Sequence, residues 1–268
     1  MTHLLLSQAN PTTVAGTAHQ SAQSPYHRLS QLVDKAARAP REAGMGVDWK
    51  IALKPRRWIP RRTTARIVSQ VLHGERIAMR LCDNIYTNMT NPVARAFLRY
   101  QREDELRHVS AYKKYINRLG DITPAGTAMQ IVEEGANTAP GGAIGRMVIC
   151  HLILESEAIR LHGELADLIA CPLLDAINNR VGPDEARHVA FGKLFLKSQI
   201  DSIDPDTRAA LGDHAKRVWQ AAAEAIFEET IGTRLIPKWL VEDRLEHAWP
   251  RHQLALDELG LSKTGFCQ

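Results

Sequence analysis

Two copies of one short motif are the residues of this chain best suited to chemistry. Glu105-x-x-His108 and Glu185-x-x-His188 are each preceded by Asp, so both segments read D-E-x-R-H, and they lie 80 residues apart. On a helix, a Glu and a His three positions apart lie on one face, about 5–6 Å apart at Cβ. A carboxylate and an imidazole placed in this way can bind one divalent metal ion together. We therefore interpret each motif as part of a metal site.

The repeat extends upstream of the two motifs. At the same offset of 80 residues, Pro92 corresponds to Pro172 and Glu75 to Glu155. Each half reads as a helix with one Glu, a turn at Pro, and a helix with Glu-x-x-His. Glu75 and Glu105 lie 17 and 13 residues from Pro92, so a helical hairpin places them at a similar level. Two packed hairpins then bring four Glu and two His together, a set that binds two iron or manganese ions in helical bundles.

The charge of the predicted cluster calls for cations. Four carboxylates in a helical core repel each other and lose hydration, which is costly unless they are protonated or bind cations. Carboxylate and imidazole ligands suit iron or manganese, whereas structural zinc sites favour thiolates. We expect two iron ions, with manganese or a mixed Mn/Fe pair as alternatives. Asp104 is expected to accept a hydrogen bond from the ring of His188, and Asp184 from that of His108, which fixes both tautomers.

The ligand position on the third helix has a competitor two residues away. Glu155 lies nearer the centre of the apolar face of that helix, whereas Glu157 lies towards the polar side with Arg160 and Glu164. We favour Glu155, although the spacing alone does not exclude Glu157.

Three further side chains lie near the predicted ligands. His151 and His162 fall on the apolar face of the third helix and are interpreted as hydrogen-bonded core histidines, with additional ligands or pocket donors as the alternative. Tyr112, one turn after His108, is interpreted as a packed tyrosine, with a redox role as the alternative. No catalytic residue beyond the metal ligands is predicted.

The elements that must position these residues are helices, since no strand pattern competes with the helical periodicity. The bundle helices are expected from Thr63 to the turn at Asn91-Pro92, from there to Leu119, from Ala143 to Ile169, and from Pro172 to about Ile200. Gly182-Pro183 is expected to interrupt and kink the last of them. Shorter helices are expected at residues 26–39, 124–134, 205–231 and 237–259. The chain is therefore divided into a flexible N-terminal extension (1–45), a basic arm (46–62), the four-helix bundle (63–202) and C-terminal helices that pack on it (203–268).

Composition and cysteine spacing exclude several classes of protein. Hydrophobic residues make up 44% of the chain and charged residues 24%, which is ordinary for a soluble globular protein. No apolar run is long enough for a membrane span, and the start of the chain does not read as a signal peptide, so a cytoplasmic protein is expected. The four cysteines form no C-x-x-C pair, which argues against a zinc ribbon, a thioredoxin-type site or a built-in rubredoxin centre.

A basic segment precedes the bundle. The segment from Lys50 to Arg66 contains seven Lys and Arg residues, with Trp49 directly before it and Trp58 within it. Such a segment can contact nucleic acid or an acidic partner. We interpret it as a solvated arm whose aromatic side chains anchor it on the domain, and keep nucleic acid as an alternative partner.

The ligand pattern resembles that of the ferritin-like di-iron carboxylate superfamily. The resemblance rests on Glu75, Glu105-x-x-His108, Glu155 and Glu185-x-x-His188 and covers about 63–200. That superfamily includes the ribonucleotide reductase small subunit and related ligand-binding oxidases, acyl-carrier-protein desaturases, aldehyde-deformylating oxygenases, p-aminobenzoate N-oxygenases and a tRNA hydroxylase. The second motif and its continuation look most like the oxidase and oxygenase branches. Val181 stands where the N-oxygenase pattern has a further His, which disfavours that subfamily.

The resemblance implies an all-α, ferritin-like four-helix bundle with additional N- and C-terminal helices. It also implies an O2-dependent di-iron oxidase or oxygenase that hydroxylates, desaturates or N-oxidises a small organic substrate. The electrons must come from an external donor, because the chain has neither a Gly-rich dinucleotide fingerprint nor a cysteine cluster. A tRNA-modifying hydroxylase and a ferroxidase that handles iron are the alternatives. The oligomeric state stays open, with a homodimer among the options.

Overall fold

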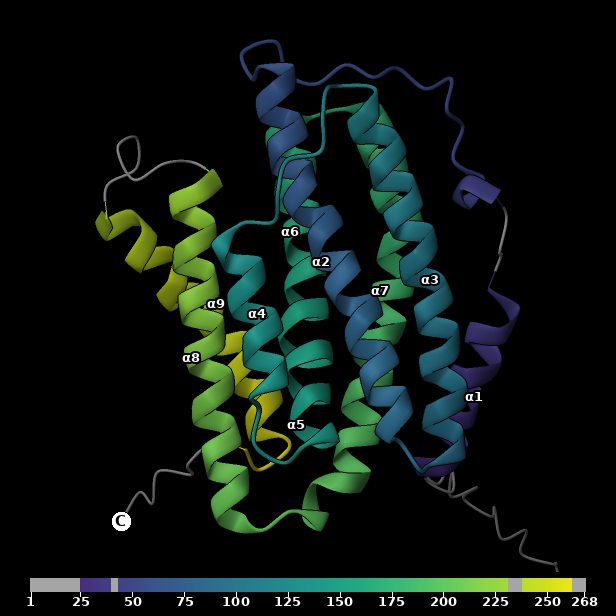
Figure 1. The fold of residues 1–268 in the computed structure, drawn as a ribbon, viewed down its shortest axis with the longest axis vertical. Helices are drawn as coiled ribbons and strands as arrows, with labels where there is room; N and C mark the ends of the chain where they lie inside the picture. The colour runs from purple at the N-terminus through teal and green to yellow at the C-terminus, as the bar shows by residue number, and fades with distance from the viewer. Residues whose placement is uncertain (1–24, 40–42, 231–237, 262–268) are drawn as a thin grey trace, which may run out of the picture.

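Four antiparallel rods form the centre of the fold (Figure 1). The computed structural model describes residues 25–39, 43–230 and 238–261, and in these it contains helices and no strands. The first two rods are α2 (Arg61–Asn88) and α3 (Pro92–Asn117), and the last is α7 (Pro172–Gln199). The third runs from Ala143 to Ile169 in three parts, α5 (Ala143–Met147), η2 (Val148–Leu154) and α6 (Glu155–Ile169). The expected all-α four-helix bundle is confirmed.

The second helix of each hairpin begins at one of the prolines that the repeat identified. Asn91 caps α3, because its Oδ1 accepts hydrogen bonds from the backbone N–H of Val93 at 3.0 Å and of Ala94 at 3.1 Å. Pro92 and Pro172 occupy first-turn positions of α3 and α7, where a missing N–H costs nothing.

The expected interruption of the fourth bundle helix is wrong. Helix α7 is continuous from Pro172 to Gln199 and contains Pro183. A proline removes one backbone hydrogen bond. The remaining bonds of this 28-residue helix, together with its packing on α3 and α6, keep it continuous.

The third rod contains a change of winding that the sequence did not predict. Val148–Leu154 forms a π-helical segment, in which the backbone N–H bonds the carbonyl five residues earlier. The N–H of Glu155 accordingly bonds the carbonyl of Cys150. The segment ends directly before Glu155, so it sets the rotation at which this carboxylate enters the bundle.

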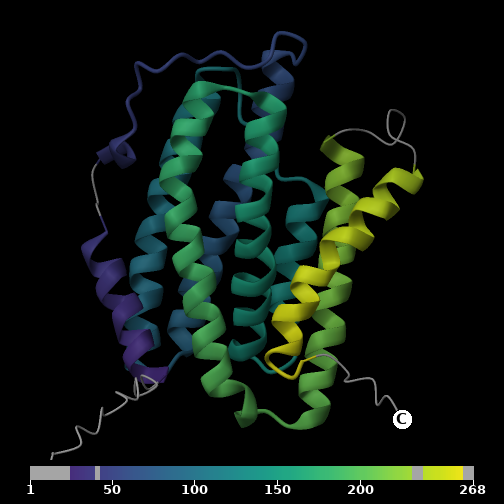
Figure 2. The same cartoon turned by 180° about the vertical axis from the view of Figure 1, so that it is seen from behind.

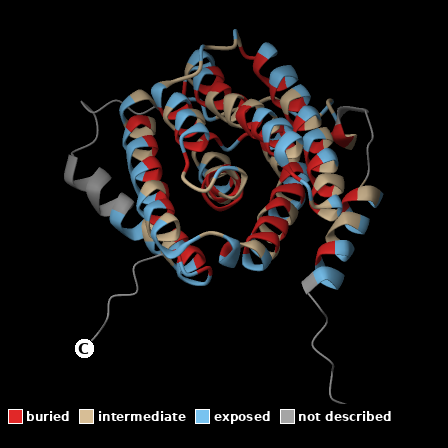
Figure 3. Ribbon diagram, turned by 60° about the horizontal axis from the view of Figure 1, so that its bottom comes forward, coloured by how far each residue is buried: buried red, intermediate tan, exposed pale blue. Residues whose placement is uncertain are grey.

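Other helices flank the bundle on two sides. The α1 helix (Pro25–Arg38) packs against α3 and α7, while α4 (Thr127–Asn137), α8 (Pro205–Thr230) and α9 (Lys238–Asp257) lie on the opposite side (Figures 1 and 2). Short 3₁₀ turns, η1 (Ala43–Gly46) and η3 (Ile200–Ser202), complete the described elements. Buried residues line the inward sides of the helices and exposed residues the outward sides (Figure 3). None of the described helices has both the length and the apolar character needed to cross a bilayer.

The basic arm lies over one end of the bundle and is anchored by one tryptophan. The ammonium group of Lys114 lies 4.1 Å from the ring centre of Trp49, and Arg118 donates to the Trp49 carbonyl at 3.1 Å. Trp58 is 69% exposed, so the expectation that both tryptophans anchor the arm is wrong for Trp58. Of the expected flexible N-terminal extension (1–45), residues 1–24 and 40–42 lie outside the described residues, as does Cys267, the last of the four cysteines.

Candidate metal centre

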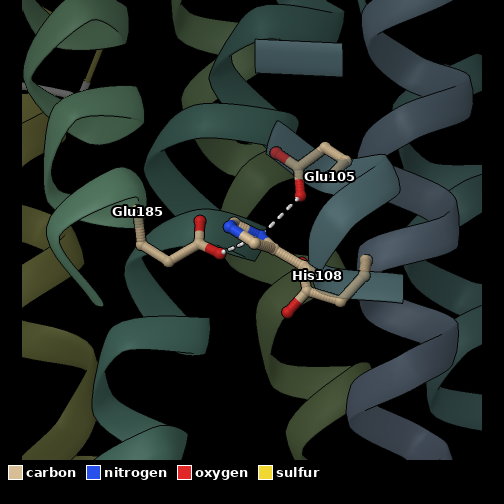
Figure 4. Close-up of side chains that lie close together, drawn as sticks. Glu105, His108 and Glu185 are labelled. Carbon is tan, nitrogen blue, oxygen red and sulfur yellow. Dashed lines mark hydrogen bonds and ion pairs between the residues drawn. The ribbon is translucent and has the colours of Figure 1, made fainter. Parts of the chain in front are cut away.

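Six acidic and imidazole side chains meet in the middle of the bundle, and all are nearly or fully buried. They form two overlapping groups, in each of which one oxygen or nitrogen per residue lies within 4.8 Å of the others. The first group is Glu75, Glu105, His108 and Glu185, and the second is Glu105, Glu155, Glu185 and His188. Glu105 and Glu185 belong to both groups, and Figure 4 shows their carboxylates on either side of the His108 ring.

The inward nitrogen of each histidine is Nδ1. His108 Nδ1 lies 3.2 Å from Glu75 Oε2, 3.2 Å from Glu185 Oε1 and 3.3 Å from Glu105 Oε2. His188 Nδ1 lies 3.2 Å from Glu105 Oε1 and 3.3 Å from Glu185 Oε2. Each Nδ1 therefore lies close to carboxylate oxygens from at least two helices.

The outward nitrogens face aspartates in a crossed arrangement. His188 Nε2 lies 3.3 Å from Asp104 Oδ2, and His108 Nε2 lies 3.3 Å from Asp184 Oδ2. Each contact places the proton of a neutral ring on Nε2, which leaves Nδ1 with a lone pair directed at the carboxylates.

Two arginines connect the aspartates. Arg187 Nη2 donates to Asp104 at 2.8 Å and to Asp184 at 2.7 Å, and Arg107 donates to Asp104 at 2.5 Å. Burial alone would raise the pKa of Asp184, but the hydrogen bond from His108 and the charge of Arg187 lower it to about 2. Asp184 is therefore an anion that accepts the ring proton of His108.

Without cations, the inner cluster retains protons. Burial, followed by the charge of Glu185, raises the pKa of Glu105 to about 8. Burial also raises the pKa of Glu155 well above the ordinary carboxyl value. For His108, burial opposes the charged form, but the Glu75 carboxylate and its other acidic neighbours raise the pKa well above its ordinary value. Positive charge is thus what this cluster requires.

Two carboxylate oxygens of the cluster are buried without a hydrogen-bond donor, as expected for oxygens that bind metal ions. Glu105 Oε2 and Glu185 Oε1 are buried and have no hydrogen-bond partner among the described residues. Both nevertheless lie within 3.3 Å of His108 Nδ1. Buried carboxylate oxygens normally have a donor or a cation. Two divalent ions would supply that charge, and the donor set of carboxylate and imidazole suits iron and manganese.

Glu155, which the sequence favoured, and Glu157, which it did not exclude, have different surroundings. Glu155 belongs to the cluster, whereas Glu157 accepts hydrogen bonds from Trp219 Nε1 at 2.9 Å and from Arg160 Nε at 2.7 Å, and pairs with His252 Nε2 at 2.5 Å. Glu157 therefore ties α6 to α8 and α9. Burial would raise its pKa, but His252 and Arg160 lower it to about 2.

The remaining residues that the sequence singled out line the cluster. Tyr112 donates to Asn178 Oδ1 at 3.0 Å, and its oxygen lies 3.1 Å from His162 Nε2. His162 Nε2 in turn lies 3.8 Å from Glu75 Oε1. Tyr112 is fully buried, so a packed, hydrogen-bonded tyrosine describes it. Tyr112 and His162 therefore lie on the Glu75 side of the cluster.

Gln101 is a buried polar residue of the site that the sequence did not predict. Its Nε2 donates to Glu155 Oε1 at 2.7 Å, and its Oε1 lies 3.0 Å from His151 Nε2. One signal pointed to it, since Gln101 lies one helical turn before Glu105 and therefore on the same face.

Comparisons with known proteins identify the fold. No protein-family model and no curated protein sequence matches the chain. Among solved structures, an R2-like ligand-binding oxidase with an aerobically reconstituted Mn/Fe cofactor has a TM-score of 0.64 at 15% identity, covering 94% of this chain and 100% of its own. Two point variants of an R2-like ligand-binding oxidase, each with an anaerobically reconstituted Mn/Fe cofactor, reach TM-scores of 0.66 at 16% and 17% identity. They cover 89% and 88% of this chain and 95% and 94% of their own. The chain therefore has the ferritin-like fold of these oxidases.

Proposed function

We propose that this protein is an O2-dependent, two-metal oxidase or oxygenase acting on a small organic substrate. The observation that carries the proposal is the pair of overlapping ligand groups that share Glu105 and Glu185. Two carboxylates common to both groups can bridge two ions, which a single-ion structural site does not need. The fold shared with oxidases that contain a Mn/Fe cofactor supports the same reading.

In this proposal each ion takes one histidine and one unshared carboxylate. Glu75 and His108 would hold one ion, Glu155 and His188 would hold the other, and Glu105 and Glu185 would contribute to both. Iron fits both positions, and a mixed Mn/Fe pair is the alternative. When bound, the metal pair supplies redox chemistry with dioxygen, and an external donor supplies the electrons.

The surrounding residues orient the ligands and exclude water. Asp104 and Asp184 keep the ring protons on Nε2, so the Nδ1 lone pairs stay available. Phe97 and Phe191 stack at 3.8 Å between ring centres, and Phe97 lies edge-on to His188 at 6.2 Å. These rings close the His188 side of the centre with apolar surface.

Anaerobic loading of the metal-free protein with Fe(II) tests the proposal. We expect two irons per chain, and exposure to O2 should consume oxygen and change the visible absorption. The variant Glu105→Gln should lose the binding of two irons and the reaction with O2, because it removes a shared ligand. The variant Glu157→Gln should retain the binding and the reaction. Binding of at most one zinc, without reaction with O2, would overturn the proposal. Continued oxidation of Fe(II) beyond two equivalents per chain would instead identify a ferroxidase.

A second candidate, modification of tRNA, is favoured by one observation. Trp58 is 69% exposed, and Lys54, Arg57 and Arg62 of the same short segment are exposed too. Exposed aromatic and basic side chains together suit stacking on bases and contact with phosphates. Titration of labelled tRNA should show binding that weakens steeply with salt and that Trp58→Ala reduces. Absence of binding at low salt would eliminate this candidate.

A further inference from the structure

Two fully buried polar side chains, Gln101 and His151, form a hydrogen-bonded pair beside Glu155. Gln101 Nε2 donates to Glu155 Oε1 at 2.7 Å and approaches Glu105 Oε1 at 3.4 Å. On its other side, Gln101 Oε1 lies 3.0 Å from His151 Nε2. Gln101 and His151 are both 0% exposed, so water does not compete for these hydrogen bonds.

A neutral His151 ring can donate one hydrogen bond to the Gln101 amide. Burial and then the charge of His188 lower the pKa of His151 to about 3, so the ring is neutral and has one proton. Its Nε2 contact with Gln101 is shorter than the 3.3 Å between Nδ1 and the Met147 carbonyl. With the proton on Nε2, the ring donates to the amide oxygen of Gln101. The amide nitrogen then points at Glu155, whereas the reverse orientation would place an oxygen against a carboxylate.

The backbone holds His151 firmly in this position. His151 lies in the π-helical segment η2, four residues before Glu155. Gly192 on α7 faces it so closely that a Cβ at that position would lie 2.3 Å from His151 Cβ. The segment and helix α7 therefore approach each other only because residue 192 has no side chain.

The other half of the repeat has no counterpart of this pair. At the offset of 80 residues, Gln101 corresponds to Val181 and His151 to Val71. Val181 is fully buried and apolar, so no amide approaches Glu75 from this direction. The polar group near Glu75 is His162, and its Nε2 stays at 3.8 Å. The two unshared carboxylates are thus held by different means.

We infer that Gln101 and His151 are positioning residues that hold one oxygen of Glu155 and so make the two metal positions inequivalent. With Oε1 bound to the amide, Glu155 presents Oε2 towards His188, whose Nδ1 is 3.7 Å away. Oε2 is then the oxygen of Glu155 that would be available to hold an ion beside His188. This inference rests on the proposed two-metal function and adds that the Glu155 position would offer its ion one carboxylate oxygen fewer than the Glu75 position, where no amide holds the carboxylate.

Anaerobic titration of the metal-free, full-length protein with Co(II) tests the inference, because the visible bands of Co(II) report its coordination number. Wild type should bind two ions with distinguishable spectra. Gln101→Leu should weaken one binding event about 10–100-fold and change its bands, while leaving the other event unchanged. His151→Phe should weaken the same event by a smaller factor. The double variant should match Gln101→Leu alone, since His151 acts through Gln101.

Tyr112→Phe is the matched control on the other side of the cluster, and it should leave the event that depends on Gln101 unaltered. Equal effects of Gln101→Leu on both ions, or none on either, would overturn the inference while the two-metal centre stands. Additive effects of the two substitutions would also overturn it, because His151 would then act independently. A wild-type protein that binds no Co(II) would instead refute the proposed function itself.

Discussion

His108 and Asp184 lie on different hairpins, yet Nε2 of the histidine is 3.3 Å from Oδ2 of the aspartate. The residues are 76 positions apart in sequence, and the reciprocal contact joins His188 to Asp104 over 84 positions. Each hairpin therefore orients the imidazole of the other. This crossing couples assembly of the bundle to assembly of the metal centre, since a hairpin alone cannot fix its own histidine.

We expect Asp184→Asn to weaken binding of one metal ion about 10–100-fold, the usual effect of removing the partner of a metal-binding histidine. An amide can still accept from Nε2, but it lacks the charge that stabilises the ring and that pairs with Arg187. Competition with a calibrated chelator measures the change. The control is Asp83→Asn, because Asp83 forms an exposed ion pair with Arg102 at 2.5 Å. Similar affinities for both variants would contradict the orienting role.

Glu155→Gln and Glu157→Gln should have different effects, because Glu155 is the proposed metal ligand and Glu157 a structural carboxylate. The first should lose one of two metal ions, because the amide neither matches the charge nor replaces the oxygen facing His188. The second should retain both ions and lose about 1–3 kcal/mol of unfolding free energy, since the pairs with His252 and Arg160 are weakened. Metal analysis and chemical denaturation measure the two effects. Loss of metal from the Glu157 variant with retention in the Glu155 variant would reverse the assignment.

Metal affinity should rise with pH up to about 8. The pKa of Glu105 is raised to about 8 and those of His108 and His188 lie above their ordinary values, so ions displace protons when they bind. Calorimetry in two buffers of different ionisation enthalpy counts the protons released. An affinity that does not change between roughly pH 6 and roughly pH 8 would contradict this expectation.

The same shifts predict the opposite trend for stability of the metal-free protein. A carboxyl with a raised pKa stabilises the native state below its unfolded pKa, and this contribution is lost as the pH rises through the folded value. For Glu105 that loss extends to about pH 8. The raised pKa values of His108 and His188 act in the same direction. The Tm of the metal-free protein should therefore fall over this range, and bound metal should abolish the fall.

The features that depend on local chemistry could be predicted from the sequence. Pro92 and Pro172 begin helices because proline suits a first turn, and their distances to Glu75 and Glu155 give the level at which the carboxylates meet. The choice between Glu155 and Glu157 depends on the rotation of the third helix. A seven-residue π-helical segment alters that rotation without changing the hydrophobic pattern.

Features that depend on tertiary contacts could not be predicted. Gln101 was missed because its partner His151 lies on another helix and its repeat counterpart is Val181. The exposure of Trp58 was missed because a tryptophan next to prolines and arginines reads equally as an anchor or as a surface residue. The role of Glu157 needs Trp219 and His252, which belong to helices outside the repeat.

Gly192→Ala should destabilise the protein by about 1–3 kcal/mol, because the added methyl group would lie 2.3 Å from His151 Cβ, an atom that only a backbone shift can move. The control is Gly163→Ala in α6, where nothing lies within 4 Å of the added Cβ. There, alanine should stabilise the helix by about 0.5–1 kcal/mol. Thermal unfolding of the metal-free variants measures both changes. Because the shift would also move His151 away from Gln101, Gly192→Ala should weaken the same Co(II) binding event as Gln101→Leu. A destabilised variant that binds both ions as wild type does would show that the close approach at Gly192 serves packing alone.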